Sequence, residues 1–207
     1  AHRSLTGKLV PCRMHDYYKG CRASEKEAYQ AVEASGLLYS KPTDPYALVA
    51  ERLAAGKIVA WFQGGAEFGP RALGNRSILA KPFPASMKDY INERVKFREY
   101  FRPFAGAILD DFRSDYCEIS QPSPHMLIAC QVRKDKREKI PAVVHVDGSC
   151  RIQTVSNQDN PRFRKVIEAF HTLTGIPIVL NTSFNIKGQP IVNTPEQAIQ
   201  TFWSTQL

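Results

Sequence analysis

Apolar positions along the chain follow two periods, and these predict helices interleaved with strands. Short runs rich in β-branched and aromatic residues predict buried strands, and apolar positions three or four apart predict amphipathic helices. We expect strands at 57–62, 77–80, 104–109, 126–130, 142–146, 151–155 and 176–180, and helices at 24–36, 44–56, 86–93, 161–173 and from 194 onward. Because the elements follow no strict βαβ repeat, the predicted fold class is α/β, or α+β with a mixed twisted sheet.

Turn and capping residues mark the ends of these elements. Ser24, Asp44 and Asn160 are expected N-caps, and Thr194 opens a capping box before a helix that we expect to continue to Leu207. Asp147-Gly148 is a strong hairpin signal between 142–146 and 151–155. The charged stretch 133–139 reads as a solvated loop.

Charge and cysteine content indicate which kinds of binding partner and which cellular compartment to expect. The 207 residues include 28 Lys and Arg against 20 Asp and Glu, a net charge of +8 that favours an anionic partner. Nucleic acid, an acidic membrane surface and a phosphorylated small molecule all fit. No run approaches the ~20 apolar residues of a membrane-spanning helix, and no signal peptide is evident at the N-terminus. Five cysteines without a C-x-x-C pair indicate reduced thiols and a cytoplasmic protein.

The segment from Gly64 to Ser77 carries the strongest chemical signal. Its glycine spacing resembles a phosphate-binding P-loop, but Asn75 stands after Gly74 where that motif needs a lysine. What remains is a loop with free backbone N–H groups and two arginines, Arg71 and Arg76, which suits phosphate or carboxylate. A plain connecting loop with its arginines paired to acids is an equal alternative.

Two further segments offer polar chemistry. Residues 95–104 alternate cations, including Lys96 and Arg102, with aromatic side chains, which suits single-stranded nucleic acid, a nucleotide, or a plain edge strand. Residues 181–185 follow a buried strand, where α/β folds place ligands, although an ordinary turn needs the same residue types.

The sequence does not predict a metal site. Cys12, His15 and Cys21 could supply three ligands, but their spacing matches no zinc ribbon or finger. A buried thiol and a hydrogen-bonded histidine are the simpler interpretation.

Taken together, the motifs resemble the C-terminal domain of the carbamoyltransferases that modify antibiotics and nodulation factors. The matching blocks occur in the family's order, and they are 61–64, 67–79, 95–96, 101–105, 145–151 and 181–192. The resemblance covers 25–207, and 1–24 remains unplaced. Two positions depart from the family pattern: Gly65-Ala66 replaces a basic residue and Met, which removes a cation near the expected phosphate site, and Gly106 replaces Pro.

The resemblance implies a YrdC-like fold with a concave basic face. Such a domain binds ATP, with Mg²⁺, and carbamoyl phosphate, and joins these small-molecule substrates as carbamoyl adenylate. Transfer to an acceptor hydroxyl belongs to a separate, metal-bearing Kae1-like N-terminal domain, which these 207 residues lack. The family usually continues beyond the final helix, so the chain resembles an excised or truncated domain.

The resemblance also assigns roles to six residues that we expect to converge on one concave surface. Lys96 and Arg102 are assigned to the ATP phosphates, and Arg71 and Arg151 to carbamoyl phosphate and its released phosphate. Lys96, Arg102 and Arg71 are the expected catalytic residues. Asn181 and Ser183 orient the carbamoyl amide or the α-phosphate. Two alternatives stay open, a non-catalytic RNA- or nucleotide-binding module and an enzyme similar to threonylcarbamoyl-adenylate synthases, although a nucleic-acid or membrane partner is not expected.

Overall fold

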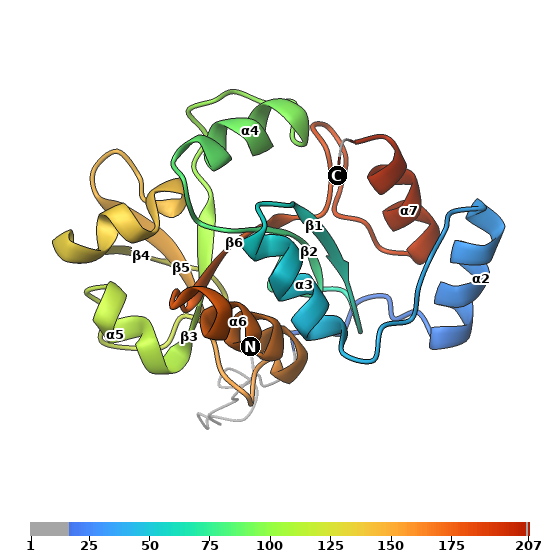
Figure 1. Ribbon diagram of the computed structural model, residues 1–207, viewed down its shortest axis with the longest axis horizontal. Coiled ribbons are helices and arrows are strands. Elements are labelled where there is room, and N and C mark those ends of the chain that lie inside the picture. The colour runs from blue at the N-terminus through green and yellow to red at the C-terminus, as the bar shows by residue number, and fades with distance from the viewer. Residues whose placement is uncertain (1–16, 206) are drawn as a thin grey trace, which may run out of the picture.

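A single mixed sheet organises the chain in a computed structural model that describes residues 17–205 and 207. Its six strands lie in the order β1-β2-β6-β3-β5-β4, and only β3 and β5 are parallel (Figure 1). The strands are β1 (Val59–Phe62), β2 (Arg76–Ala80), β3 (Ala105–Leu109), β4 (Ile128–Gln131), β5 (Ser149–Val155) and β6 (Ile178–Ser183). The α-helices are α2 (Glu25–Ser35), α3 (Pro45–Ala54), α4 (Ser86–Arg94), α5 (Arg113–Tyr116), α6 (Pro161–Thr174) and α7 (Pro195–Trp203), and the 3₁₀ helices are η1 (Asp110–Phe112), η2 (Lys134–Lys139) and η3 (Pro141–Val143).

Alternating side chains place a hydrophobic core on each face of the sheet. Leu79 and Val179 point toward α3 and α6, which pack together across one face (Figure 1). Ile78 and Ile178, one position away, belong to the core on the other face, which also takes up the apolar side of α4. The sheet is thus covered on both faces, as expected for an α/β protein.

Capping residues begin and end the helices as predicted. Ser24 and Thr194 both form complete capping boxes, and the Asp44 and Asn160 side chains accept hydrogen bonds from backbone N–H groups of α3 and α6. Gly36 and Gly175 end α2 and α6 in the left-handed conformation that glycine adopts most easily.

The predicted hairpin around Asp147-Gly148 is wrong on its first side. Residues 142–146 are not a strand, because both edges of β5 are already paired, with β3 and with β4. A 3₁₀ helix and a tight turn approach β5 instead, and the His145 N–H donates to the Ser149 carbonyl at 2.7 Å.

Three other secondary-structure elements differ from the prediction in type or in where they end. The charged stretch 133–139 is largely the 3₁₀ helix η2 and not a loop, and the last helix ends at Trp203 rather than continuing to Leu207. Strand β6 continues through Ser183, so Asn181 lies in the sheet and not in a loop after it. The candidate metal ligands Cys12 and His15 lie outside the described residues.

The described part of the unplaced segment 1–24 packs against the glycine-rich loop. The Gly20 N–H donates to the Ala66 carbonyl at 3.0 Å, the Ala66 N–H donates to Cys21, and Arg22 forms a β-bridge with Gly65. Residues 17–24 therefore belong structurally to the domain. Within the described residues, we find no helix with the length and apolar character needed to cross a membrane.

Candidate functional site

Two adjoining pockets contain all six predicted site residues. The first, the Lys96 pocket, has a volume of about 380 Å³ and is lined by Lys96, Arg98, Glu99, Arg102, Ser183 and residues 185–189. The second, the Arg151 pocket, has a volume of about 90 Å³ and is lined by residues 70–72, Arg98, residues 103–105, Met126, Arg151 and residues 181–183. Arg98 and Ser183 line both, so the two pockets share a wall.

Lys96 is a buried cation that holds the end of β6. Its ammonium donates to the carbonyl oxygens of Ser183 and Asn185 at 2.6 and 2.9 Å and to the Asn185 side-chain oxygen at 2.8 Å. These contacts use its three N–H groups. Burial, helped by the nearby Arg98 cation, lowers the pKa of Lys96 to about 7. The residue thus shapes the pocket wall, and an incoming anion has to compete for its donors.

Arg102 and Arg98 supply the more accessible charge. Arg102 is 57% exposed at its side chain, and its Nε lies 3.3 Å from Glu99, which also pairs with Lys187 at 3.6 Å. The Arg98 Nε donates to the Asn92 side-chain oxygen at 2.7 Å, and its guanidinium stacks on the Phe104 ring. Burial and the neighbouring Arg102 lower the pKa of Arg98. Glu99 thus partly neutralises a group of cations that otherwise repel one another.

Arg151 and Arg71 place two like charges at the Arg151 pocket. Arg151 projects from β5 and is half-buried, whereas Arg71 is exposed. Burial lowers the pKa of Arg151, and the Arg71 cation lowers it further. The Arg151 Nε is buried without a hydrogen-bond partner. An anion between the two arginines would relieve both the repulsion and this unpaired donor.

A hydrogen-bond network fixes which way the Asn181 amide points. The Gln153 Nε2 donates to the Leu73 carbonyl at 2.9 Å, so the Gln153 oxygen faces Asn181 and accepts its Nδ2 at 2.9 Å. The same Nδ2 also donates to the Ala72 carbonyl at 3.2 Å. The Asn181 Oδ1 is left buried with no partner. This oxygen could therefore accept a hydrogen bond from a ligand N–H.

The glycine-rich loop is built differently from the prediction. Three of its backbone N–H groups are not free, because one Glu67 oxygen accepts hydrogen bonds from those of Leu73, Asn75 and Arg76 at 2.7, 2.8 and 3.2 Å. The Arg76 side chain is fully buried, stacks on the Phe62 ring and donates to backbone carbonyls, among them that of Gln63 at 2.6 Å. Of the two arginines in this loop, only Arg71 lines one of the two pockets, the Arg151 pocket.

The Gly65-Ala66 departure does not remove a cation from this cleft. Both residues are buried and line neither pocket. A Cβ at Gly65 would overlap the Tyr18 carbonyl oxygen, so residues 18–22 leave no room for a longer side chain there. Position 65 therefore lies away from both pockets, and the effect of the Gly65-Ala66 departure on nucleotide affinity stays a prediction.

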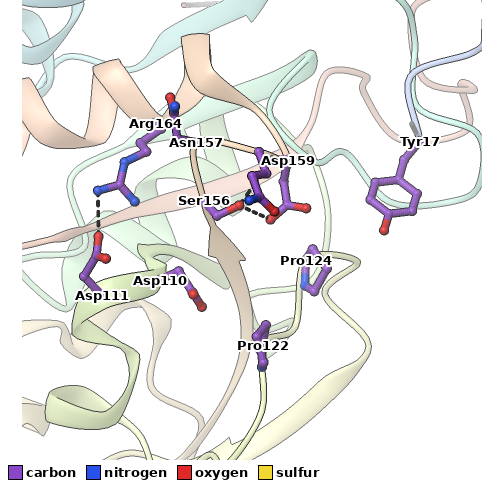
Figure 2. Close-up of a pocket in the computed structure, with 10 residues that line it drawn as sticks. Tyr17, Asp110, Asp111, Pro122, Pro124, Ser156, Asn157, Asp159 and Arg164 are labelled. Carbon is purple, nitrogen blue, oxygen red and sulfur yellow. Dashed lines mark hydrogen bonds and ion pairs between the residues drawn. The ribbon is translucent and has the colours of Figure 1, made fainter. Parts of the chain in front are cut away.

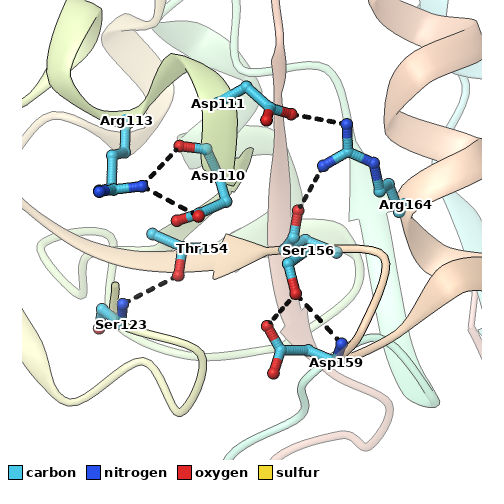
Figure 3. A network of polar contacts seen from close by, with 9 residues as sticks. Asp110, Asp111, Arg113, Ser123, Thr154, Ser156, Asp159 and Arg164 are labelled. Atoms are coloured by element: carbon cyan, nitrogen blue, oxygen red, sulfur yellow. Dashed lines mark hydrogen bonds and ion pairs between the residues drawn. The ribbon is translucent and has the colours of Figure 1, made fainter. Parts of the chain in front are cut away.

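A larger pocket of about 780 Å³ lies elsewhere but is acidic (Figure 2). Asp110, Asp111 and Asp159 line it, and its cation, Arg164, is paired with Asp111 at 2.6 Å (Figure 3). Asp110 pairs with Arg113 at 2.9 Å, outside the lining residues. The acidic lining would repel a phosphate, so this pocket does not suit the anion that the net charge predicts.

Sequence reasoning missed one residue that lines the two pockets, Arg98, and one that shapes the adjacent loop, Glu67. Arg98 lies in the segment of alternating cations and aromatics, so its charge could have been counted with Lys96 and Arg102. Glu67 lies in the most informative motif, but nothing local indicates that its carboxylate would fold back onto the loop amides.

Comparison with known proteins shows the family to which the chain belongs. Residues 50–207 match the family model described as Carbamoyltransferase C-terminus, and the chain belongs to that family. It is 49% identical over 161 residues to nodulation protein NolNO of Sinorhizobium fredii, covering 76% of the chain and 24% of that protein. It is 42% identical over 189 residues to the uncharacterized protein sll1178 of Synechocystis, covering 82% of the chain and 31% of that protein. The chain thus spans less than a third of the length of these relatives.

The fold is similar to part of HypF. The match to full-length HypF in its phosphate- and nucleotide-bound form has a TM-score of 0.54 at 17% identity, covering 80% of this chain and 20% of HypF. HypF of T. kodakarensis gives a TM-score of 0.52. The likeness confirms the predicted YrdC-like, mixed α/β fold.

Proposed function

We propose that this domain binds ATP and carbamoyl phosphate side by side and joins them as carbamoyl adenylate. Lys96 and Arg102 contact the ATP phosphates, Arg71 and Arg151 bind carbamoyl phosphate and its released phosphate, and Asn181 and Ser183 orient the reacting groups. The observation that carries this proposal is the pair of unpartnered buried atoms, Arg151 Nε and Asn181 Oδ1, at one cationic pocket.

The chemistry of carbamoyl phosphate matches these two atoms. Its phosphate is an anion that an arginine can bind through two parallel hydrogen bonds, and its amide carries N–H donors that need an acceptor. The Asn181 oxygen is such an acceptor, held by the Gln153 network. The Arg151 pocket, with the volume of roughly three water molecules, suits a group of this small size.

The reaction balances without a redox partner. Water cleaves carbamoyl phosphate to carbamate and phosphate, and a carbamate oxygen then attacks the α-phosphorus of ATP while pyrophosphate leaves. Both steps develop negative charge between Arg71, Arg98, Arg102 and Arg151, and preorganised cations stabilise such charge. These arginines serve electrostatically, and no side chain has to form a covalent intermediate.

The Lys96 pocket fits a polyphosphate better than a bare metal ion. Glu99 is the one carboxylate among its lining residues, and it already pairs with Arg102 and Lys187. A magnesium ion would therefore enter on the phosphates of ATP, whose charge it partly neutralises. Its volume of about 380 Å³ lies within the range of small-ligand sites.

A complete carbamoyltransferase needs a second active centre for transfer to the acceptor hydroxyl. We assign that step to a Kae1-like N-terminal domain, in the same or a partner chain, and we place the reaction in the cytoplasm, where ATP is supplied. This domain alone then forms the adenylate slowly and transfers nothing, because nothing in the described residues closes over the cleft to exclude water.

Calorimetry tests binding. ATP with magnesium should bind, carbamoyl phosphate should strengthen that binding, and Arg151→Ala should weaken carbamoyl phosphate more than ATP. Arg102→Ala should weaken ATP by about 1.5–3 kcal/mol if it makes a charge-assisted bond. Arg162→Ala is the matched control, since Arg162 is exposed on α6 and lines neither pocket. Equal losses in Arg162→Ala and Arg151→Ala would contradict the site.

Pyrophosphate release tests the reaction. It should depend on carbamoyl phosphate and decrease in Lys96→Ala and Arg151→Ala. Carbamoylation of an acceptor by this chain alone would contradict the division of labour between two domains.

A further inference from the structure

Three cysteines from separate segments meet beneath the edge strand of the sheet. Cys117 follows α5, Cys130 lies in β4 and Cys150 lies in β5, and their sulfurs are all within 4.8 Å of one another. The Cys117 and Cys150 sulfurs are 3.6 Å apart, and those of Cys130 and Cys150 are 3.9 Å apart. All three side chains are buried, with exposed fractions of 1%, 8% and 0%.

Backbone pairing brings these residues together. Cys130 and Cys150 are direct partners in the antiparallel β4–β5 ladder, and Cys117 forms a β-bridge with Val132, two residues beyond Cys130. The sulfurs meet because three strand-like segments are in register. Since this pairing is long-range, no local spacing in the sequence reveals it, which is why the sequence predicts no metal site.

The sulfur separations fit a shared metal ion better than a disulfide. A disulfide joins two sulfurs at about 2.05 Å. A metal ion with sulfur ligands at about 2.3 Å in tetrahedral geometry places those sulfurs about 3.8 Å apart. The Cys117–Cys150 and Cys130–Cys150 separations lie on either side of that value, and all three sulfurs lie within 4.8 Å of one another.

We propose that Cys117, Cys130 and Cys150 bind a soft metal ion with a filled d shell, of the Zn²⁺ or Cu⁺ class, through three thiolates. Thiolates select such ions over Mg²⁺ or Ca²⁺. The ion joins the segment after α5 to β4 and β5, so it fastens the edge of the sheet directly beside Arg151. Binding releases the thiol protons to solvent and involves no redox step.

Cadmium titration of the full, freshly reduced chain tests this proposal. Cd²⁺ should bind with one equivalent per chain, produce the ultraviolet absorbance of thiolate-to-cadmium charge transfer, and raise the midpoint of thermal unfolding. Excess Zn²⁺ should displace it. The absence of a charge-transfer band at one equivalent would overturn the proposal.

Variants assign the ligands. Cys130→Ala should weaken Cd²⁺ binding at least about a hundredfold. Cys130 is chosen because it lies on the edge strand β4, where a substitution should disturb the fold least. The control is Cys12→Ser with Cys21→Ser, which removes the remaining two of the five cysteines and should leave the band unchanged. A band that follows Cys12 and Cys21 instead would refute the site.

A measurement on the unmutated chain covers the case in which Cys130→Ala does not fold. Alkylation in partly denaturing urea, followed by mass spectrometry, should label Cys117, Cys130 and Cys150 more slowly with Cd²⁺ than without it, whereas Cys21, which is exposed, should react equally in both. The metal-free chain, denatured without reductant, should show five free thiols. A disulfide that mass spectrometry maps to Cys117, Cys130 or Cys150 would end the proposal.

Discussion

Glu67 should contribute more to the stability of the domain than any exposed acidic residue. One of its oxygens accepts hydrogen bonds from three backbone amides, those of Leu73, Asn75 and Arg76. Glu67→Ala leaves these donors without a charged acceptor in a loop that is largely buried. The same loop carries Arg71 and Ala72 to the Arg151 pocket, so stability and ligand binding should decline together.

The magnitude follows from the number of bonds. A hydrogen bond to a charged group contributes about 1.5–3 kcal/mol, and three bonds to one oxygen are not additive. We therefore expect Glu67→Ala to lower the free energy of unfolding by about 3–5 kcal/mol. Glu67→Gln keeps an oxygen acceptor but loses the charge, and because charge-assisted bonds are roughly twice as strong as neutral ones, about half the loss is expected.

Urea denaturation followed by circular dichroism measures these changes. Glu25→Gln is the control, because Glu25 forms only an exposed ion pair with Lys41 at 3.5 Å and should change the stability little. A Glu67→Ala variant as stable as Glu25→Gln would show that water satisfies the loop amides. Equal losses in Glu67→Ala and Glu67→Gln would refute the role of the charge.

Three other substitutions test separate parts of the structure. Gly74→Ala should unfold at a clearly lower urea concentration, because Gly74 has a φ of 102° and an added Cβ would overlap the Phe163 ring. Gly69→Ala should lower the stability less, because Gly69 has a φ of 134° but faces open space. Sulfate keeps its charge near neutral pH, so its affinity should fall as pH rises through about 7 and Lys96 loses its proton, and Lys96→Gln should abolish this dependence. Asn181→Asp should lower the affinity for inorganic phosphate at least about tenfold, as measured by calorimetry. It adds a negative charge at a buried oxygen that has no hydrogen-bond donor.

Local signals predicted the helices well because the forces that end a helix are local. The Ser24 and Thr194 capping boxes are complete within four residues, and Gly175 needs only its own left-handed backbone to end α6. The strands were harder to predict, because a segment becomes a strand only where a neighbouring strand has an unpaired edge. The 142–146 segment has a suitable composition, but β5 offers it no unpaired edge.

The candidate site likewise combines features that the local sequence predicts with contacts between segments that it does not. Family motifs brought out the residues that now line the cleft, among them Arg71, Lys96 and Arg151. They did not indicate that Lys96 already holds the end of β6 or that Glu67 occupies the loop amides, because both are contacts between segments. Residue identity predicted which groups are present, and only the fold determines which of them are already occupied.

The wall common to the two pockets gives the site a thermodynamic property of its own. Arg98 and Ser183 face both the Lys96 pocket and the Arg151 pocket, so an anion that draws Arg98 to one side changes the field at the other. Whatever factor the first ligand applies to the affinity of the second, the second must apply to the first, because binding free energies are reciprocal. If the two proposed ligands bind here, each would therefore change the affinity of the site for the other through Arg98, the arginine that lines both pockets.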